Sequence, residues 1–200
     1  ICKGGKPVYE HVLGAVSGAW WHTNTCTDGT PNGYAIFTVK GNSVDDFVYK
    51  PVDLDESYQM RVYNGSQKYT GSKKLTFGWP EEYHGCFIAD VFNDDAENWK
   101  VEFIQNGVAT PMTRVTKKLR DWCMFSYFIN ENGRSPKNTA YHTGKLHYWT
   151  LPAPSGNPAK EKNWEIRATY TVPTSGKVNV YTVNTLQTDY TGFPATLADE

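Results

Sequence analysis

The sequence lacks the side-chain groupings that most hydrolytic enzymes need. No Gly-x-Ser-x-Gly segment and no Cys-x-x-Cys pair occurs in the 200 residues, so the signatures of a serine hydrolase and of a zinc knuckle are both missing. The histidines are few and scattered, at positions 11, 22, 84, 142 and 147. We therefore expect this chain to hold no catalytic residue and no metal ligand.

The sequence also lacks an excess of charge of one sign and any long hydrophobic run. Twenty basic and twenty-one acidic residues give a net charge of −1, which provides no long-range field to attract nucleic acid or an anionic membrane. No stretch approaches the roughly eighteen consecutive apolar residues of a membrane-spanning helix. We expect neither nucleic acid nor a membrane span among the interactions of this chain.

Cysteine is sparse, with four residues at positions 2, 26, 86 and 123. Cys86 lies in an apolar strand and Cys123 on an apolar helix face, so we interpret both as buried free thiols. One disulfide between Cys2 and Cys26 is an open alternative. His84 and Cys86 would share one face of a strand, but apolar neighbours disfavour the thiolate that a Cys–His catalytic pair requires.

Aromatic residues, by contrast, are plentiful. They make up 14% of the chain, with seven tryptophans and thirteen tyrosines. Such side chains favour pleated sheets, interfaces and sugar-like ligands. Short alternating segments bounded by turn residues dominate the sequence, a pattern typical of an antiparallel sandwich. The predicted strands are 11–16, 34–40, 46–50, 58–63, 74–78, 86–92, 99–105, 145–150, 164–172 and 177–186.

One helix is predicted, over residues 115–130. Its apolar residues recur at spacings of four and three, and Asn132-Gly133 supplies a stop. The stripe consists of Val115, Leu119, Trp122, Ser126 and Ile129. Packed across a sheet, it would close one end of the sandwich. The sequence thus predicts a mainly β fold: an antiparallel two-sheet β-sandwich with one amphipathic helix.

Carboxylates gather in two polar stretches, 45–56 and 93–98. The first lacks the glycine of a calcium-binding loop, and the second has the Asn and Asp residues of a turn. We interpret both as solvated loops. Glycosidase chemistry would need two facing carboxylates. Candidates for that pair are Glu81, Glu82, Asp90 and Glu102, although any protein of this size offers such residues.

A resemblance to a known family begins in residues 18–42. The cluster comprises Gly18, Trp20, Trp21, Asp28, Gly29, Pro31, Asn32, Gly33 and Tyr34. With the alternating strand that follows, it resembles the start of the C-terminal region of calcineurin-like metallophosphoesterases. Residues 58–63 resemble that region's next strand, 89–107 its central hairpin with the Asn106-Gly107 turn, and 145–149 fit more loosely. The resemblance covers roughly residues 9–185.

The resemblance implies a position after an active site. Members of that family hold two metal ions with Asp-x-His, Gly-Asp, Gly-Asn-His and Gly-His-x-His motifs, because both ions must clamp one phosphate. None of these motifs occurs here. The resemblance therefore implies a non-enzymatic accessory domain that scaffolds a catalytic domain or shapes substrate access. Two divalent metals would belong to the catalytic domain alone, and the protein would be secreted, periplasmic or at the cell surface.

The same resemblance suggests how the chain is divided. The first residue is Ile1 and no leader follows it, so we expect a fragment. Catalytic domains of that family end in a hairpin of the form seen in residues 33–50. We expect residues 1–50 to border or end the absent catalytic domain, 51–187 to form the β-sandwich C-terminal domain, and 188–200 to be a tail.

Five aromatic residues are candidates for an interface or a ligand surface. Adjacent Trp20 and Trp21 must point to opposite sides of an extended chain, so one of them would be exposed. The others are Tyr34, Trp99 and Trp149. The expected partner is the chain's own catalytic domain. Two alternatives stay open: a sandwich module that binds carbohydrate or another surface ligand, and an independent hydrolase.

Overall fold

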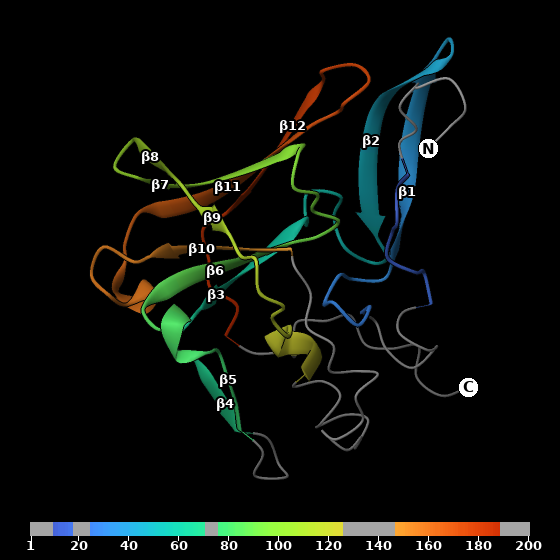
Figure 1. The fold of residues 1–200 in the computed structure, drawn as a ribbon. Helices are drawn as coiled ribbons and strands as arrows, with labels where there is room; N and C mark the ends of the chain where they lie inside the picture. The colour runs from blue at the N-terminus through green and yellow to red at the C-terminus, as the bar shows by residue number, and fades with distance from the viewer. Residues whose placement is uncertain (1–9, 18–24, 71–75, 126–146, 189–200) are drawn as a thin grey trace.

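The structure is a computed structural model, and it describes residues 10–17, 25–70, 76–125 and 147–188. Two four-stranded antiparallel sheets pack face to face (Figure 1). The inner sheet has the order β3-β6-β10-β9 and the outer sheet the order β12-β11-β7-β8. This arrangement confirms the predicted mainly β, two-sheet architecture.

Two hairpins accompany the sheets, β1–β2 and β4–β5. The strands are β1 Gly33–Lys40, β2 Ser43–Pro51, β3 Met60–Asn64, β4 Lys68–Thr70, β5 Thr76–Gly78, β6 Cys86–Val91, β7 Trp99–Gln105, β8 Val108–Pro111, β9 Thr113–Arg114, β10 Tyr148–Pro152, β11 Trp164–Thr171 and β12 Val178–Val183. Short 3-10 helices are η2 Glu81–Tyr83 and η4 Pro158–Lys160.

The outer sheet buries one face. Along β11 every second residue is buried, beginning at Trp164 and ending at Tyr170. This is expected for a strand that has one face in the core and the other exposed to solvent. Its neighbour β7 turns into β8 at Asn106-Gly107, where both residues have positive φ, 52° and 79°. That geometry suits a tight hairpin, so the predicted turn is confirmed.

The inner sheet is covered on both faces, because a second apolar cluster packs against the face turned away from the outer sheet. All six residues of β6 are buried. Phe87 and Ala89 belong to the core between the sheets, whereas Ile88 lies in the second cluster together with Tyr63 and Tyr148. A strand buried on both faces reads as a continuous apolar run rather than an alternation.

The predicted helix is wrong over its first half. Residues 115–121 are not helical, and of the described residues only 122–125 have helical conformation there. The stripe is nevertheless buried: Val115, Leu119 and Trp122 all pack into the second cluster. The backbone N–H of Val115 instead donates to the carbonyl of Tyr148 at 2.8 Å. The segment is therefore irregular, and it packs its apolar residues on the inner sheet before the helix begins. Residues 126–130 lie outside the described part.

The strand predicted at 11–16 is also absent, since residues 10–15 have no strand pairing. Leu13 packs against the core, whereas Val12 is 82% exposed. No neighbouring strand supplies a ladder of hydrogen bonds. The remaining predicted strands correspond to strands of the structure, whereas β4, β8 and β9 were not predicted as separate elements.

Hairpin β1–β2 stands beside the sandwich (Figure 1). Strand β2 contributes Phe47 and Tyr49 to the core between the sheets. Side chains that follow β11 hold the backbone of β2: Ser175 Oγ donates to the Asp45 carbonyl at 2.7 Å, and Asn179 Nδ2 to the Phe47 carbonyl at 3.2 Å. The hairpin is thus fixed through β2.

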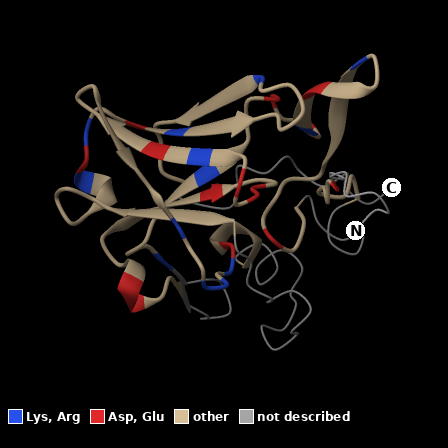
Figure 2. Cartoon of the chain, turned by 45° about the horizontal axis from the view of Figure 1, so that its top comes forward, with Lys and Arg blue, Asp and Glu red and all other residues tan. Residues whose placement is uncertain are grey.

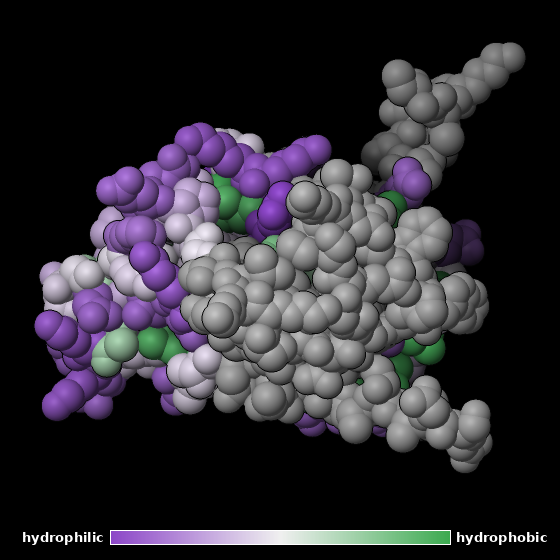
Figure 3. Space-filling model, turned by 90° about the horizontal axis from the view of Figure 1, so that it is seen from below, coloured by the Kyte–Doolittle hydropathy of each residue, from purple (hydrophilic) through white to green (hydrophobic). Residues whose placement is uncertain are grey.

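Strand β1 is exposed along most of its length. The exposed fractions are 48% for Tyr34, 44% for Ile36, 41% for Phe37 and 61% for Val39. In Figure 2 the charged residues of this hairpin gather near its tip. By contrast, the described surface on the left of Figure 3 is largely hydrophilic, with small separated apolar patches. β1 is therefore an apolar strand that the described part of the chain covers only in part, through the contacts of Phe37 with His11 and Phe47.

No helix in the described residues is long and apolar enough to cross a membrane.

Candidate functional site

Arg61 is a charged side chain that is buried although it lies on β3, an edge strand of the inner sheet. Because residues of β3 alternate, Met60 and Val62 enter the core while Arg61 and Tyr63 point to the opposite face. The Arg61 guanidinium lies 4.8 Å above the ring of Phe92. Its Nη1 lies 3.3 Å from the Tyr63 hydroxyl. A cation held this deep requires an anionic partner.

Asp121 is the first such partner. Its Oδ2 lies 3.3 Å from Arg61 Nη1 and accepts a 2.6 Å hydrogen bond from the Tyr63 hydroxyl. Its Oδ1 accepts from the backbone N–H of Met124 at 2.6 Å. Asp121 thereby caps the helical turn and neutralises Arg61 with the same carboxylate. Neither the Asp121 nor the Arg61 side chain is exposed to solvent.

Gly29 brings the N-terminal loop onto this pair. Arg61 Nη2 donates to the Gly29 carbonyl. The φ of Gly29 is +90°, and a Cβ at this position would lie 2.4 Å from the Asp121 carboxyl carbon. Only glycine has both the backbone conformation and the space. The loop around residue 29 is therefore part of the buried network.

Asp90 and His147 extend the network toward β10. The carboxylate of Asp90 lies 3.6 Å from Arg61 Nη1 and 2.7 Å from His147 Nδ1. Burial raises the pKa of Asp90 to about 7, although His147 and Arg61 act to lower it. Burial alone would lower the pKa of His147, but the carboxylates of Asp90, Asp28 and Asp94 raise it to about 9. The neighbouring carboxylates therefore favour the protonated form of the imidazole.

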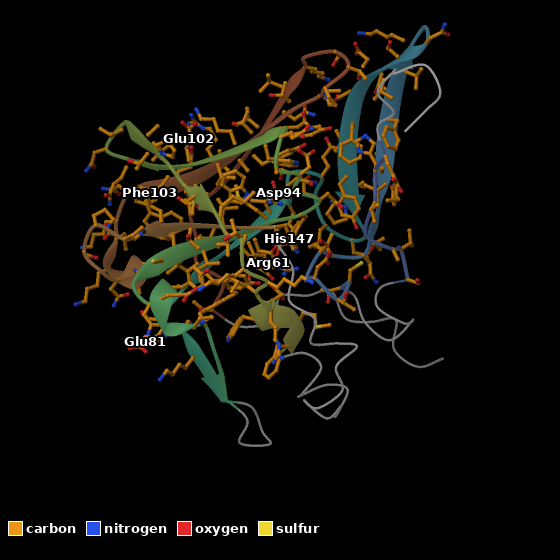
Figure 4. All side chains as sticks on the ribbon, in the orientation of Figure 1. Arg61, Glu81, Asp94, Glu102, Phe103 and His147 are labelled. Carbon is orange, nitrogen blue, oxygen red and sulfur yellow. The ribbon has the colours of Figure 1, made fainter. Side chains whose placement is uncertain are left out.

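A cavity of about 330 Å³ opens beside His147. Figure 4 shows Asp94, His147 and Arg61 one below another on the side of the sandwich that faces β1 and β2. The cavity is bounded by the 10–14 segment, the 93–95 loop and side chains of β2 and β11. Its lining residues are Glu10, His11, Val12, Leu13, Gly14, Asp28, Phe47, Asn93, Asp94, Asp95, His147 and Tyr170.

Across the described residues, no group of three or more His, Cys, Asp and Glu side chains could hold a metal ion. Cys86 and Cys123 are buried free thiols, as the sequence predicted. Burial raises the pKa of Cys86, and the neighbouring His84 contacts the Trp79 carbonyl at 3.2 Å. Cys26 is also a free thiol, and its Cys2 alternative partner lies outside the described part.

The carboxylates considered for glycosidase chemistry do not form a site. Figure 4 shows Glu81 at the lower left and Glu102 on the outer sheet, well apart in this view. Glu82 pairs with Lys117 at 2.9 Å, and Glu102 pairs with Lys100 at 2.7 Å. Asp90 is occupied by Arg61 and His147. These contacts are structural ion pairs rather than an acid and a base that face a shared substrate.

The interpretation as loops is right for residues 93–98 but wrong for the start of 45–56, because Asp45 and Asp46 lie in strand β2. Asp95 Oδ1 accepts from the backbone N–H groups of Glu97 and Asn98, at 2.9 and 2.6 Å, which is a turn held by its own side chain. In the other stretch, Asp46 pairs with Lys177 and accepts from Asn179 at 2.8 Å. That carboxylate attaches β2 to the outer sheet.

The five aromatic residues named from the sequence do not come together. Trp99 is buried against Tyr170, with ring centroids 5.1 Å apart, and Trp149 is buried in the core between the sheets. Tyr34 is half exposed on β1. Trp20 and Trp21 lie outside the described residues. A ligand role for any of the five stays a prediction.

Sequence reasoning missed Arg61, Asp121 and His147. One signal was present: Arg61 stands between Met60 and Val62 in a strand whose neighbours are apolar. A basic residue in such a strand needs a buried acid. The position of that acid, sixty residues later at Asp121, depends on the folded chain.

A protein-family model described as the C terminal of calcineurin-like phosphoesterase matches residues 10–173. No curated protein and no solved structure matches the chain.

Proposed function

The chain belongs to the family of C-terminal domains of calcineurin-like phosphoesterases, and from this premise we propose that it is a non-catalytic accessory domain. In this proposal it packs against the catalytic domain of the same protein and shapes the access of substrate. The parent protein would be secreted, periplasmic or at the cell surface, which rests on the resemblance to that family.

The exposure of β1 carries the proposal. Four large apolar side chains on one short strand are each more than 40% exposed. They lie on both faces of the strand, because successive side chains alternate. Large contiguous apolar surfaces are rare on monomeric proteins. Since β1 pairs with β2 alone within the described sheets, one edge of it is also open to another strand. A catalytic domain would cover this strand, which agrees with the proposed border near residue 50.

The buried charge network around Arg61 favours a structural role rather than a catalytic one. Arg61 lies within ion-pair distance of both Asp90 and Asp121 in the interior. A catalytic carboxylate must instead reach a bound substrate. The two divalent metals expected of the family would be held by the catalytic domain, whose motifs this sequence lacks.

We predict that the isolated chain does not hydrolyse phosphate monoesters or diesters. The measurement is release of nitrophenol from a chromogenic phosphate ester with manganese present. Rates should equal those of buffer, because the sequence lacks the four metal-ligand motifs. Turnover that survives repurification and follows the protein through gel filtration would contradict the proposed non-catalytic role.

A second prediction concerns β1. The isolated chain should bind a hydrophobic dye more strongly than the full-length protein, and replacing Ile36 and Val39 with threonine should remove roughly half of the dye signal, because these are two of the four large apolar side chains exposed on β1. Threonine keeps the β-branched shape, so the strand itself should persist.

The matched control is the pair Val108→Thr and Val180→Thr, since these valines are 66% and 52% exposed but lie on the outer sheet. The control should leave dye binding nearly unchanged. Equal dye binding by the isolated chain and the full-length protein would show that β1 is not a covered interface.

A further inference from the structure

We propose that the preceding catalytic domain adds one strand to the free edge of β1, so that the two domains share a continuous sheet. This inference rests on the proposed accessory role and deepens it, because it says how the covering partner is bound. A strand added to a sheet edge is held by main-chain hydrogen bonds.

The hydrogen-bond pattern of the hairpin determines which backbone groups of β1 point away from β2. The N–H of Val52 donates to the carbonyl of Asn32 at 2.8 Å, and the register of β1 and β2 is regular from this end as far as Thr38. Bonded and non-bonded residue pairs alternate along an antiparallel ladder. Every second residue counted from Asn32 therefore bonds to β2, whereas the N–H and C=O groups of Ala35 and Phe37 face outward.

The opposite edge of the hairpin, on β2, is closed by side chains. The N–H of Phe47 donates to Asp46 Oδ1 at 2.9 Å, and its carbonyl accepts from Asn179 Nδ2 at 3.2 Å. The carbonyl of Tyr49 accepts from Gln59 Nε2 at 2.5 Å. Within the described residues, no strand and no side chain closes the outer edge of β1 in this way. Since β2 lies between β1 and the outer sheet (Figure 1), β1 provides the edge that is left for pairing.

The composition of β1 favours pairing as well. Natural edge strands are usually protected by charged residues, proline or bulges. Residues 33–39 contain no charged residue and no proline, and the irregularity in the register comes only after Thr38. The regular part, 33–38, matches a typical strand of about 5–6 residues. It is therefore long enough to pair with a complete strand.

The exposed side chains distinguish an added strand from a partner that packs on one face. Tyr34 and Ile36 lie on one face of β1, and Phe37 and Val39 lie on the other. A partner packed on one face would leave the other two side chains in water. An added strand brings its own side chains beside both faces, with Cβ atoms of opposite residues about 4.5–5.5 Å apart. Edge pairing therefore gives all four side chains a neighbour.

The path of the chain favours the catalytic domain as the source of this strand. A C-terminal domain is linked to the preceding domain through its own N-terminal segment. In that segment, the ring of His11 lies 5.4 Å from the ring of Phe37 on β1 and 4.9 Å from that of Phe47 on β2. A tethered partner has a high effective concentration near the point where its linker arrives. The link to the catalytic domain thus arrives at the hairpin that offers the free edge.

The test is hydrogen–deuterium exchange at single-residue resolution, comparing the 200-residue chain with the full-length protein. In the full-length protein, the outward amides of Ala35 and Phe37 should exchange at least about tenfold more slowly, because they are then hydrogen-bonded. The amides of Tyr34 and Ile36 bond to β2 in both proteins. They are the internal control and should already be protected in the isolated chain.

The key variant is Ala35→Pro in the full-length protein. Proline removes an outward N–H that the hairpin does not use, and it is tolerated on the solvent side of an edge strand. The variant should lose the protection of Phe37 and should bind more hydrophobic dye than the unmodified full-length protein. Ala35→Ser is similar in size and keeps the N–H, so this matched control should change neither property. Circular dichroism should show that both variants fold.

The outcomes separate this inference from the accessory role on which it rests. Unchanged exchange at Ala35 and Phe37, with dye binding still weaker in the full-length protein, overturns strand addition but leaves a partner packed on a face of β1. Unchanged exchange together with equal dye binding overturns both proposals. Protection that rises with protein concentration also overturns strand addition by the catalytic domain, because the strand would then come from a second copy of the protein.

Discussion

Replacing Arg61 with leucine is expected to destabilise the chain by about 3–5 kcal/mol, the cost of breaking a fully buried ion pair from one side. The leucine would leave the Asp121 and Asp90 carboxylates in the interior without their cation. It would also remove the donors to the Gly29 carbonyl and the Tyr63 hydroxyl. The measurement is urea unfolding followed by tryptophan fluorescence.

Two further variants make that result interpretable. Lys117→Ala removes an ion pair of similar length, 2.9 Å to Glu82, but at the surface, where such pairs contribute little; its urea midpoint should hardly move. Adding Asp121→Asn to Arg61→Leu removes one stranded charge, so part of the lost stability should return. A loss below about 1 kcal/mol for Arg61→Leu, typical of a surface pair, would mean that the network is not buried as described.

The free energy of unfolding is expected to fall between about pH 6.5 and pH 9, by at most about 3 kcal/mol, through His147 alone. The pKa of His147 is raised to about 9 in the folded chain, from 6.5. A raised histidine pKa stabilises the fold fully below the unfolded value, and this contribution is lost as pH rises through the folded value. The pKa of Asp90 is also raised, to about 7. Its titration therefore also lowers the free energy of unfolding as pH rises, over a lower pH range than that of His147.

Comparison with His147→Gln isolates this contribution. The variant should be less stable than the unmodified chain at pH 6.5, and the difference should shrink toward pH 9. His11→Gln, at an exposed position, serves as the control and should follow the unmodified chain throughout. A constant difference between His147→Gln and the unmodified chain across this range would show that His147 does not hold its proton through Asp90.

The β-strands were predictable because their signals are local. Trp164 to Tyr170 alternates along the strand, and Asn106-Gly107 specifies a tight turn regardless of the distant sequence. The helix at 115–121 failed for a different reason. Spacings of three and four place Val115, Leu119 and Trp122 on one side of a helix, but an irregular segment that crosses a sheet can bury the same residues. The spacing of the apolar residues therefore predicts that they are buried, but it does not determine the backbone conformation.

The candidate site could not be predicted because its contacts join distant parts of the chain. Arg61, Asp121 and His147 belong to three separate segments, and their pairing follows from the order β3-β6-β10. Asp90 was considered as a catalytic acid from the sequence, whereas in the fold it lies opposite Arg61 in the β3–β6 register. Residue type alone gives no information on which charges share a sheet face.

The position of Gly29 has a practical meaning for anyone who shortens this protein. The proposed border near residue 50 invites a version that begins at β3. That version would keep Arg61 and Asp121 but would discard the carbonyl to which Arg61 donates, together with the backbone that packs against the Asp121 carboxyl group. Water would then reach a charge pair that is dry in the complete fold. A stable minimal domain should therefore retain the loop at residues 25–31, and with it the β1–β2 hairpin that connects this loop to β3.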